Sequence, residues 1–119
     1  MEKLTFKIDC LWGKYLFEAA ADEGKIVYRS SSDIEGFTDK EGTLDDPRAF
    51  LNLIEEAHIE KWEKEYKGEN GIEDAIKWSV EFEDGGHRYL SSGEEAFWPY
   101  GYDKLIQAIR LVDEDIDRF

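Results

Sequence analysis

The sequence has few of the residues that build cross-linked or membrane-embedded proteins. Its 119 residues include one cysteine, Cys10, and two prolines. A single cysteine excludes an internal disulfide and fits a reducing compartment. No apolar run approaches the roughly 18 residues that a membrane-spanning helix needs. The residues after Met1 alternate between charged and apolar types and lack the apolar core of a signal peptide. We therefore expect a cytoplasmic protein that does not enter a membrane.

Basic residues are also scarce. Fifteen Lys and Arg stand against 29 Asp and Glu, which gives a formal net charge of −14. The excess is no tail, because residues 1–60 and 61–119 each carry −7. Such a surface repels phosphate backbones and anionic lipids, which argues against direct binding of nucleic acid or of a membrane. It favours encounter with a basic protein partner. Acidity that serves solubility alone would give the same composition.

The remaining composition is that of one folded domain spanning residues 1–119. Apolar residues make up 41% of the chain and aromatic residues 14%, which is too many for a disordered protein. A chain of this length buries about two thirds of its unfolded surface. The sequence contains no repeat, linker or low-complexity tract that would divide it.

Alternation of apolar and polar residues predicts three strands in the first half. Leu4–Cys10 and Tyr15–Ala19 carry this period-two pattern, and Lys25–Ser30, which contains Ile-Val-Tyr, is the third predicted strand; short turns lie between them. The following segment, Ser31–Thr43, is polar and contains glycine, so it is predicted to be a loop.

A helix is expected next, because Asp45-Asp46-Pro47 combines a capping carboxylate with a proline suited to the first helical turn. Its apolar face predicts that it continues to about His58. The segment Ile59–Tyr66 is compatible with either a helix or a strand, because Trp62 and Tyr66 share a face in both. Residues 67–74 are predicted to be a loop.

The second half ends in a predicted hairpin and helix. Ile76–Glu83 is the clearest alternating strand, Gly85-Gly86 suits a tight turn, and His87–Ser91 returns beside it. A loop over Ser92–Gly101 precedes a helix over Tyr102–Asp115. Together these elements predict an α+β fold in which an antiparallel sheet of about five strands packs against two helices.

The second half also carries a recognisable pattern of single residues. A tryptophan and a tyrosine four apart precede a glycine, a tryptophan strand, a glycine hairpin and a loop ending in proline before the last helix; these are Trp62, Tyr66, Gly71, Trp78, Gly85, Gly93, Ala96, Pro99 and Leu105. This pattern resembles a family of small uncharacterised bacterial proteins, from which the chain departs by one extra aromatic residue before Pro99. The resemblance implies a fold for about half the chain, and no activity.

No residue pattern points to catalysis. The two histidines, His58 and His87, belong to no metal-binding or acid–base motif, and Cys10 continues an apolar alternation typical of a core thiol. The spacing of Asp113, Asp115 and Asp117 imitates the start of a calcium loop whose glycine and distal glutamate are missing. We therefore predict no enzyme activity, no cofactor and no metal site.

The candidate binding residues lie on the loop before the last helix: Phe97, Trp98, Tyr100 and Tyr102, with the acidic Glu94 and Glu95 beside them. Aromatic side chains ringed by acidic ones are typical of a protein-recognition patch. Pro99 restricts the backbone and would hold such side chains at low entropic cost. In the alternative interpretation, Trp98 closes the core at the base of the helix.

The leading hypothesis is a non-enzymatic acidic protein that engages a basic protein surface. Its sharpest form is an inhibitor that imitates nucleic acid and blocks a host defence nuclease, encoded by a phage or other mobile element. One alternative is a small cytoplasmic enzyme or ligand-binding domain that uses an aromatic pocket around His87. Another is an immunity-type or housekeeping interaction module. The oligomeric state is left open by the sequence.

Overall fold

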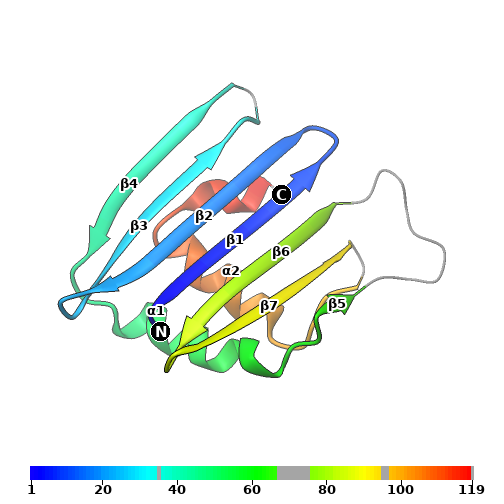
Figure 1. Cartoon of the computed structure of the whole chain (residues 1–119). Coiled ribbons are helices and arrows are strands. Elements are labelled where there is room, and N and C mark those ends of the chain that lie inside the picture. The colour runs from blue at the N-terminus through cyan, green and yellow to red at the C-terminus, as the bar shows by residue number, and fades with distance from the viewer. Residues whose placement is uncertain (35, 67–75, 95–96, 119) are drawn as a thin grey trace.

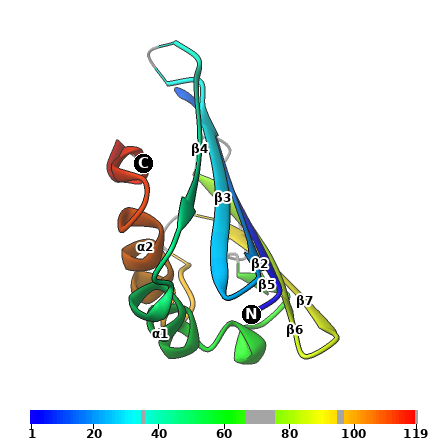
Figure 2. The ribbon, with the colours of Figure 1, turned by 90° about the vertical axis from the view of Figure 1, so that its left-hand side faces the viewer.

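The computed structural model describes residues 1–34, 36–66, 76–94 and 97–118. These residues form a seven-stranded sheet with two α-helices on one of its faces (Figures 1 and 2). The strand order is β4-β3-β2-β1-β6-β7-β5, and only the β5–β7 pairing is parallel. The predicted α+β class is confirmed, and the sheet has more strands than the five expected. No helix in the described ranges has the length and hydropathy needed to cross a bilayer.

The alternating segments form the centre of the sheet. The predicted strands of the first half and of the hairpin are all present, with bounds β1 Lys3–Cys10, β2 Gly13–Asp22, β3 Lys25–Ser32, β6 Lys77–Asp84 and β7 His87–Glu94. β1 lies between β2 and β6, which joins the two halves of the chain in one sheet. Because β7 extends to Glu94, it includes three residues that were expected to be loop.

Two edge strands differ from the prediction. β4 (Thr38–Leu44) occupies most of the expected loop over Ser31–Thr43, so that prediction is wrong there. It pairs with β3 alone and most of its side chains are exposed, so it lacks the apolar alternation that marks a half-buried strand. At the other edge, β5 (Glu65–Tyr66) has two residues and follows the 3-10 helix η1 (Ile59–Lys61). The ambiguous segment is therefore neither one helix nor one strand.

The helices begin within a residue of where the sequence predicts, although Pro47 is the N-cap of the first helix and not its first residue, and the expected side-chain cap of that helix is not formed. α1 (Arg48–Ala57) follows Pro47, and Asp46 Oδ1 accepts a hydrogen bond from the Arg48 amide at 3.2 Å. α1 ends at His58 in the left-handed conformation. α2 (Tyr102–Arg110) is five residues shorter than predicted, and the chain continues into the 3-10 helix η2 (Glu114–Arg118).

The core lies between the helices and the inner face of the sheet. β1, β2, β3 and β6 supply its central side chains, and the helices add theirs from above; the largest fully buried ones are Tyr15, Phe6, Phe17, Phe50, Leu4, Ile26, Ile59, Leu105 and Ile109. Figure 2 shows the helices gathered on one side of the sheet, with no α-helix on the other. The outer sheet face is therefore open to solvent.

A buried carboxylate ties the end of α2 to the sheet. Asp113 follows α2, and its Oδ2 accepts a 2.7 Å hydrogen bond from the Tyr15 hydroxyl of β2. Its Oδ1 accepts bonds from Lys40 Nζ at 3.2 Å and from the Asp115 amide at 3.0 Å. These contacts lie just beyond the end of α2, where the chain leads into η2. They give Asp113 a structural role within the acidic tail.

This network predicts that part of the stability depends on pH. Burial by itself raises the pKa of Asp113, but hydrogen bonds outweigh it and hold the pKa below its ordinary value; the donors are Ser30, Tyr15, the Asp115 amide and Lys40. A lowered carboxyl pKa contributes stability above the unfolded value of about 4, and the contribution is lost as pH falls through the folded value. Denaturant melts between about pH 2 and 6 should show a shallower pH dependence for Asp113→Asn than for the parent. Equal slopes would contradict this role.

Candidate functional site

The histidines lie apart from the predicted aromatic patch. His87 begins β7 opposite Asp84, whereas Gly93 near the end of β7 lies opposite Trp78 in the aromatic cluster. Six residues of strand separate the two positions, which is about 20 Å. His58 is exposed at the end of α1. Within the described ranges, no group of three or more His, Cys, Asp or Glu side chains is arranged to hold a metal ion.

The predicted aromatic loop is partly packed and partly presented to solvent. Trp98 is 39% exposed, and its ring lies 4.4 Å from that of Tyr102 and 6.1 Å from that of Trp78. Phe97 is about as exposed as Trp98, whereas Tyr100 is 94% exposed. Trp98 therefore covers the core with one side of its ring, and Tyr100 is the projecting aromatic residue.

Of the other predicted site residues, Tyr102 contacts the loop through Trp98 but faces the core. Tyr102 is held among the rings of Phe6, Trp62 and Trp78, and burial raises the pKa of its hydroxyl well above the ordinary range. Glu94 lies on the outer face of the sheet, because its neighbour Gly93 lies on the inner face beneath Trp78. Glu95 lies outside the described residues.

The backbone of the loop is fixed against α1. Trp62 Nε1 lies 2.9 Å from the Ala57 carbonyl and 3.1 Å from the Tyr100 carbonyl, so one indole links the end of α1 to the loop. Gly101 has φ 95° and packs directly on Ala57. The loop is therefore held in place by Trp62 and Ala57, which are far away in the sequence. This restraint adds to the one expected from Pro99.

Two substitutions separate the packed from the projecting aromatic residue. We expect Trp98→Ala to lower the melting temperature by several degrees, because its ring contacts Trp78 and Tyr102. Tyr100→Ala should leave the melting temperature within about two degrees, since the side chain is exposed. Thermal melts followed by circular dichroism check both. Similar losses in the two variants would show that the exposed ring also carries fold stability.

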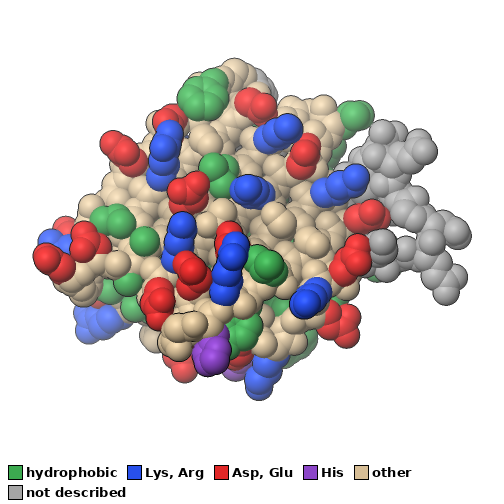
Figure 3. Space-filling view, in the orientation of Figure 1, with side chains coloured by type: hydrophobic (Ala, Val, Ile, Leu, Met, Phe, Trp, Pro, Cys, Tyr) green, Lys and Arg blue, Asp and Glu red, His purple; other side chains and the backbone are tan. Residues whose placement is uncertain are grey.

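The outer sheet face carries both signs of charge in alternation, as Figure 3 shows. Across the strands, Asp9 lies opposite both Lys14 and Lys77, and Arg29 lies opposite both Glu18 and Glu41. Outward-facing positions of the seven strands hold seven basic and nine acidic residues, a net of −2. Oppositely charged side chains on neighbouring strands stabilise the sheet modestly and keep its outer face hydrated.

The helical layer is much more acidic. Residues 45–63 and 102–117, which include both α-helices, hold eleven acidic and four basic side chains, a net of −7. One of the eleven, Asp113, is buried, and Lys40 of β4 pairs with it and with Asp115 on this side of the sheet. Half of the total charge of −14 therefore lies on these 35 residues. The negative charge is divided evenly along the sequence. It is divided unevenly across the fold, because the outward strand positions hold nearly equal numbers of basic and acidic residues.

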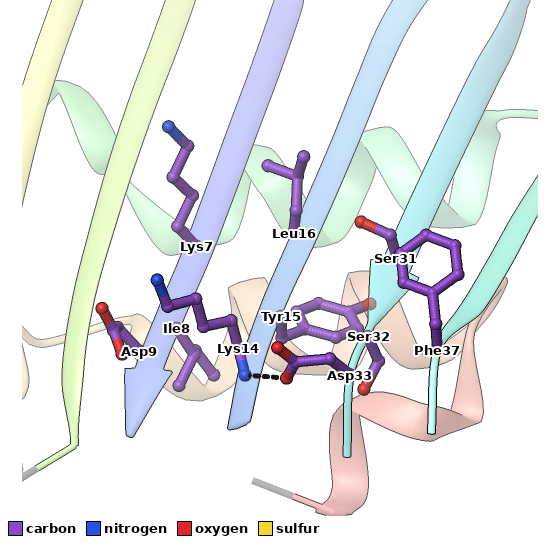
Figure 4. A pocket seen from close by; sticks show the side chains of 10 residues that line it. All are labelled: Lys7, Ile8, Asp9, Lys14, Tyr15, Leu16, Ser31, Ser32, Asp33 and Phe37. Atoms are coloured by element: carbon purple, nitrogen blue, oxygen red, sulfur yellow. Dashed lines mark hydrogen bonds between the residues drawn. The ribbon is translucent and has the colours of Figure 1, made fainter. Parts of the chain in front are cut away.

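The outer face is hollowed near the end of β1 and the beginning of β2. A hollow of about 430 Å³ lies there, with Lys7 and Lys14 on one side and Ser31 and Phe37 on the other (Figure 4). Leu16 also lines it, along with Asp9, Ile8, Tyr15, Ser32 and Asp33. Lys7 lies opposite Leu16 on β2 and Ser79 on β6, so neither cross-strand neighbour is acidic.

Exposed hydrophobic side chains gather at the same end of the sheet. Leu11 and Trp12 form the β1–β2 turn and Phe37 precedes β4, and each is more than half exposed. The sequence pattern predicts only a turn and a loop at these residues. A large apolar residue in a short turn was the available signal, because turns are usually polar.

The comparisons with known proteins add no relative. No protein-family model, curated protein or solved structure matches the chain. The resemblance to a bacterial family therefore stays a prediction, and two of its positions, Gly71 and Ala96, lie outside the described residues.

Proposed function

We propose that the protein is a non-enzymatic binding protein that engages a basic protein surface through its helical layer. The observation that supports this best is the segregation of charge, with −7 on the helical segments and −2 on the outer face of the sheet. Acidity needed only for solubility has no reason to be concentrated on one layer. A concentrated field steers a basic partner toward that layer and orients it there.

The contacts within the layer support the same assignment. Most of its cations are already paired with local carboxylates, as in Arg48–Asp46 at 2.7 Å, Lys104–Glu56 at 3.5 Å and Arg110–Asp117 at 2.7 Å. A partner would therefore meet a surface whose few positive charges are internally compensated. Glu55, Glu56 and Glu60 are exposed around the end of α1. We place the centre of the proposed interface at these three carboxylates.

The more specific form of this proposal is nucleic-acid mimicry. A partner groove that binds a phosphate backbone would accept an acidic layer in its place, and occupation would inhibit the partner. A host defence nuclease is such a partner. This form predicts that the protein does not bind duplex DNA itself, since like charges repel. It also predicts that the protein releases DNA from a basic competitor.

A charge-matched pair of variants tests the proposal. The probe is fluorescein-labelled nona-arginine, followed by anisotropy at low and moderate salt. The variant with Glu55→Gln, Glu56→Gln and Glu60→Gln should bind at least about tenfold more weakly. The control with Glu18→Gln, Glu41→Gln and Glu81→Gln loses the same formal charge from the outer sheet face. It should stay within about threefold of the parent.

Two outcomes would contradict the proposal. Equal weakening in both triple variants would mean that net charge alone attracts the probe. Failure of the parent to release labelled duplex DNA from nona-arginine would remove the mimicry form and leave the simpler binding function.

A further inference from the structure

We propose that the outer face of the sheet carries a binding site for a small phosphate monoester. The site is a second hollow, which we call the serine hollow, between β1, β6 and β7, with a volume of about 300 Å³. The lining residues that carry the argument are Thr5, Lys7, Lys64, Ser79, Glu81 and Leu90. The helices cover the opposite face of the sheet (Figure 2), so this proposal is independent of the proposed function.

Strand register explains why the sheet is hollowed here. On the outer face, Lys7 of β1 lies opposite Ser79 of β6, and Ser79 lies opposite Ser92 of β7. The neighbouring outward positions on β6 and β7 hold the longer side chains of Glu81 and Leu90. Two short serines beside longer side chains leave a space about 10 Å wide, which is two strand spacings.

Two lysines border the serine hollow from opposite sides. Lys7 lies on the β1 side, and Lys64, whose backbone bonds to β7, lies on the other. Figure 4 shows the Lys7 side chain turned away from Asp33 and Phe37. Within the described ranges, neither ammonium group has an ion-pair partner, although the chain has 29 acidic residues and 15 basic ones. An anion bound between the two lysines would supply the missing negative charge.

The backbone at Lys64 is fixed in advance of binding. The Ser92 amide donates to the Lys64 carbonyl at 3.0 Å, and Ser92 Oγ donates to the same oxygen at 3.4 Å. The Ser91 hydroxyl donates to the carbonyl of Glu63 at 2.6 Å. A bound anion therefore orders lysine side chains without ordering this part of the backbone, which keeps the entropic cost of binding low.

The polar groups of the serine hollow select an anion. The hydroxyls of Thr5 and Ser79 have no hydrogen-bond partner among the described residues. Glu81, the acidic residue of the described lining, already binds Arg88. Two ammonium groups and two hydroxyls can all donate to the oxygen atoms of one ligand. A phosphate monoester, which carries close to two negative charges at neutral pH, matches the two lysines better than a carboxylate does.

The size of the serine hollow indicates an ester and not a free phosphate ion. A bare phosphate would leave most of the 300 Å³ empty. Leu90 is 54% exposed on the wall of the hollow, so an apolar organic group next to the phosphate would cover it. Removing this apolar surface from water favours the ester over the ion.

The net charge of −14 does not prevent this binding. The Debye length at physiological salt is about 8 Å, so the exposed carboxylates of the helical layer, across the core, are largely screened from the outer face. Among the lining residues and their ion-pair partners, Glu81 stands against Arg88 and two lysines, a local net charge of +2. Duplex DNA differs from a small ester, because it would place further phosphates over outward carboxylates such as Glu18.

Titration of the full chain with phenyl phosphate tests the proposal. With nitrogen-15-labelled protein in about 0.1 M NaCl, the amide signals of β1, β6 and β7 around the serine hollow should shift, and those of α1 and α2 should not. The double variant Lys7→Gln with Lys64→Gln should bind at least about tenfold more weakly. The control, Lys3→Gln with Lys77→Gln, removes the same charge from the same face outside the hollow. It should stay within about twofold of the parent.

Inorganic phosphate separates the ester from the free ion. It should bind at least about threefold more weakly than phenyl phosphate, and Leu90→Ala should abolish this difference. Equal binding of the two ligands to the parent would overturn the assignment of an ester.

Two results would overturn the site itself. One is the absence of localised shifts up to about 10 mM phenyl phosphate, and the other is equal weakening in both double variants. Well-dispersed amide spectra establish that the variants are folded. Neither result touches the proposed function, because nona-arginine binding is measured with substitutions on the helical layer.

Discussion

Replacing Trp78 by alanine should lower the free energy of unfolding by roughly 3–5 kcal/mol. The side chain is 2% exposed, on the inner face of β6 near the start of the strand. Its ring lies within about 6 Å of those of Trp62, Tyr66, Trp98 and Tyr102, so its removal leaves a cavity bounded by four aromatic side chains. For a domain of this size, that is a large share of the total stability.

Trp12→Ala is the matched control, because it deletes the same side chain from an exposed turn. We expect it to change the free energy of unfolding by less than about 0.5 kcal/mol. Urea melts at fixed pH measure both variants. A loss below about 1 kcal/mol for Trp78→Ala would mean that the aromatic cluster is not part of the cooperative core.

Gly101→Ala should destabilise the protein by about 2–5 kcal/mol for two separate reasons. The backbone φ of 95° is one that residues with a side chain rarely adopt. In addition, the new Cβ would lie closer than 3.0 Å to the Ala57 backbone, including its carbonyl carbon. That carbonyl also accepts a hydrogen bond from Trp62, so the loop cannot move away without loss.

Gly24→Ala isolates the first of these reasons. Gly24 has φ 80° and nothing within 4 Å of an added Cβ, so its replacement carries backbone strain without a clash. We expect a cost of about 1 kcal/mol for Gly24→Ala in the same melts. Equal effects at the two glycines would show that the close packing of the loop on α1 adds nothing.

The parts of the fold that could be predicted from sequence are the strands with one buried and one solvent-exposed face. β1, β2, β3 and β6 each lie inside the sheet, so burial imposes a period of two on their residues. β4 is exposed and polar, and its strand character comes from pairing with β3, which no local pattern records. α2 ends at Arg110 although the apolar pattern continues, and just beyond it Asp113 binds Tyr15, 98 residues away, a contact that no local pattern records.

The candidate site shows the same limit. Aromatic residues on the loop before α2 could be found by their number, but which ring is packed depends on Trp78 and Trp62 from other elements. The hollow on the outer sheet face could not be predicted, because most of its lining comes from residues of β1, β2 and β3 that become neighbours only through strand register. Charge segregation is likewise a property of the assembled faces.

The edge strand β4 has a further consequence for how the protein behaves when it is concentrated. An exposed edge offers unpaired backbone groups to which strands of other molecules can add, which is a common route to aggregation. On β4 the flanking Asp39 and Glu41 face outward, while Lys40 points inward and binds Asp113 and Asp115. A strand that pairs with β4 would have to accommodate the charge of Lys40 on the inner side and the carboxylates of Asp39 and Glu41 on the outer side. The β4 edge therefore disfavours the addition of a strand from another molecule, and crowding should not drive association through this edge of the sheet.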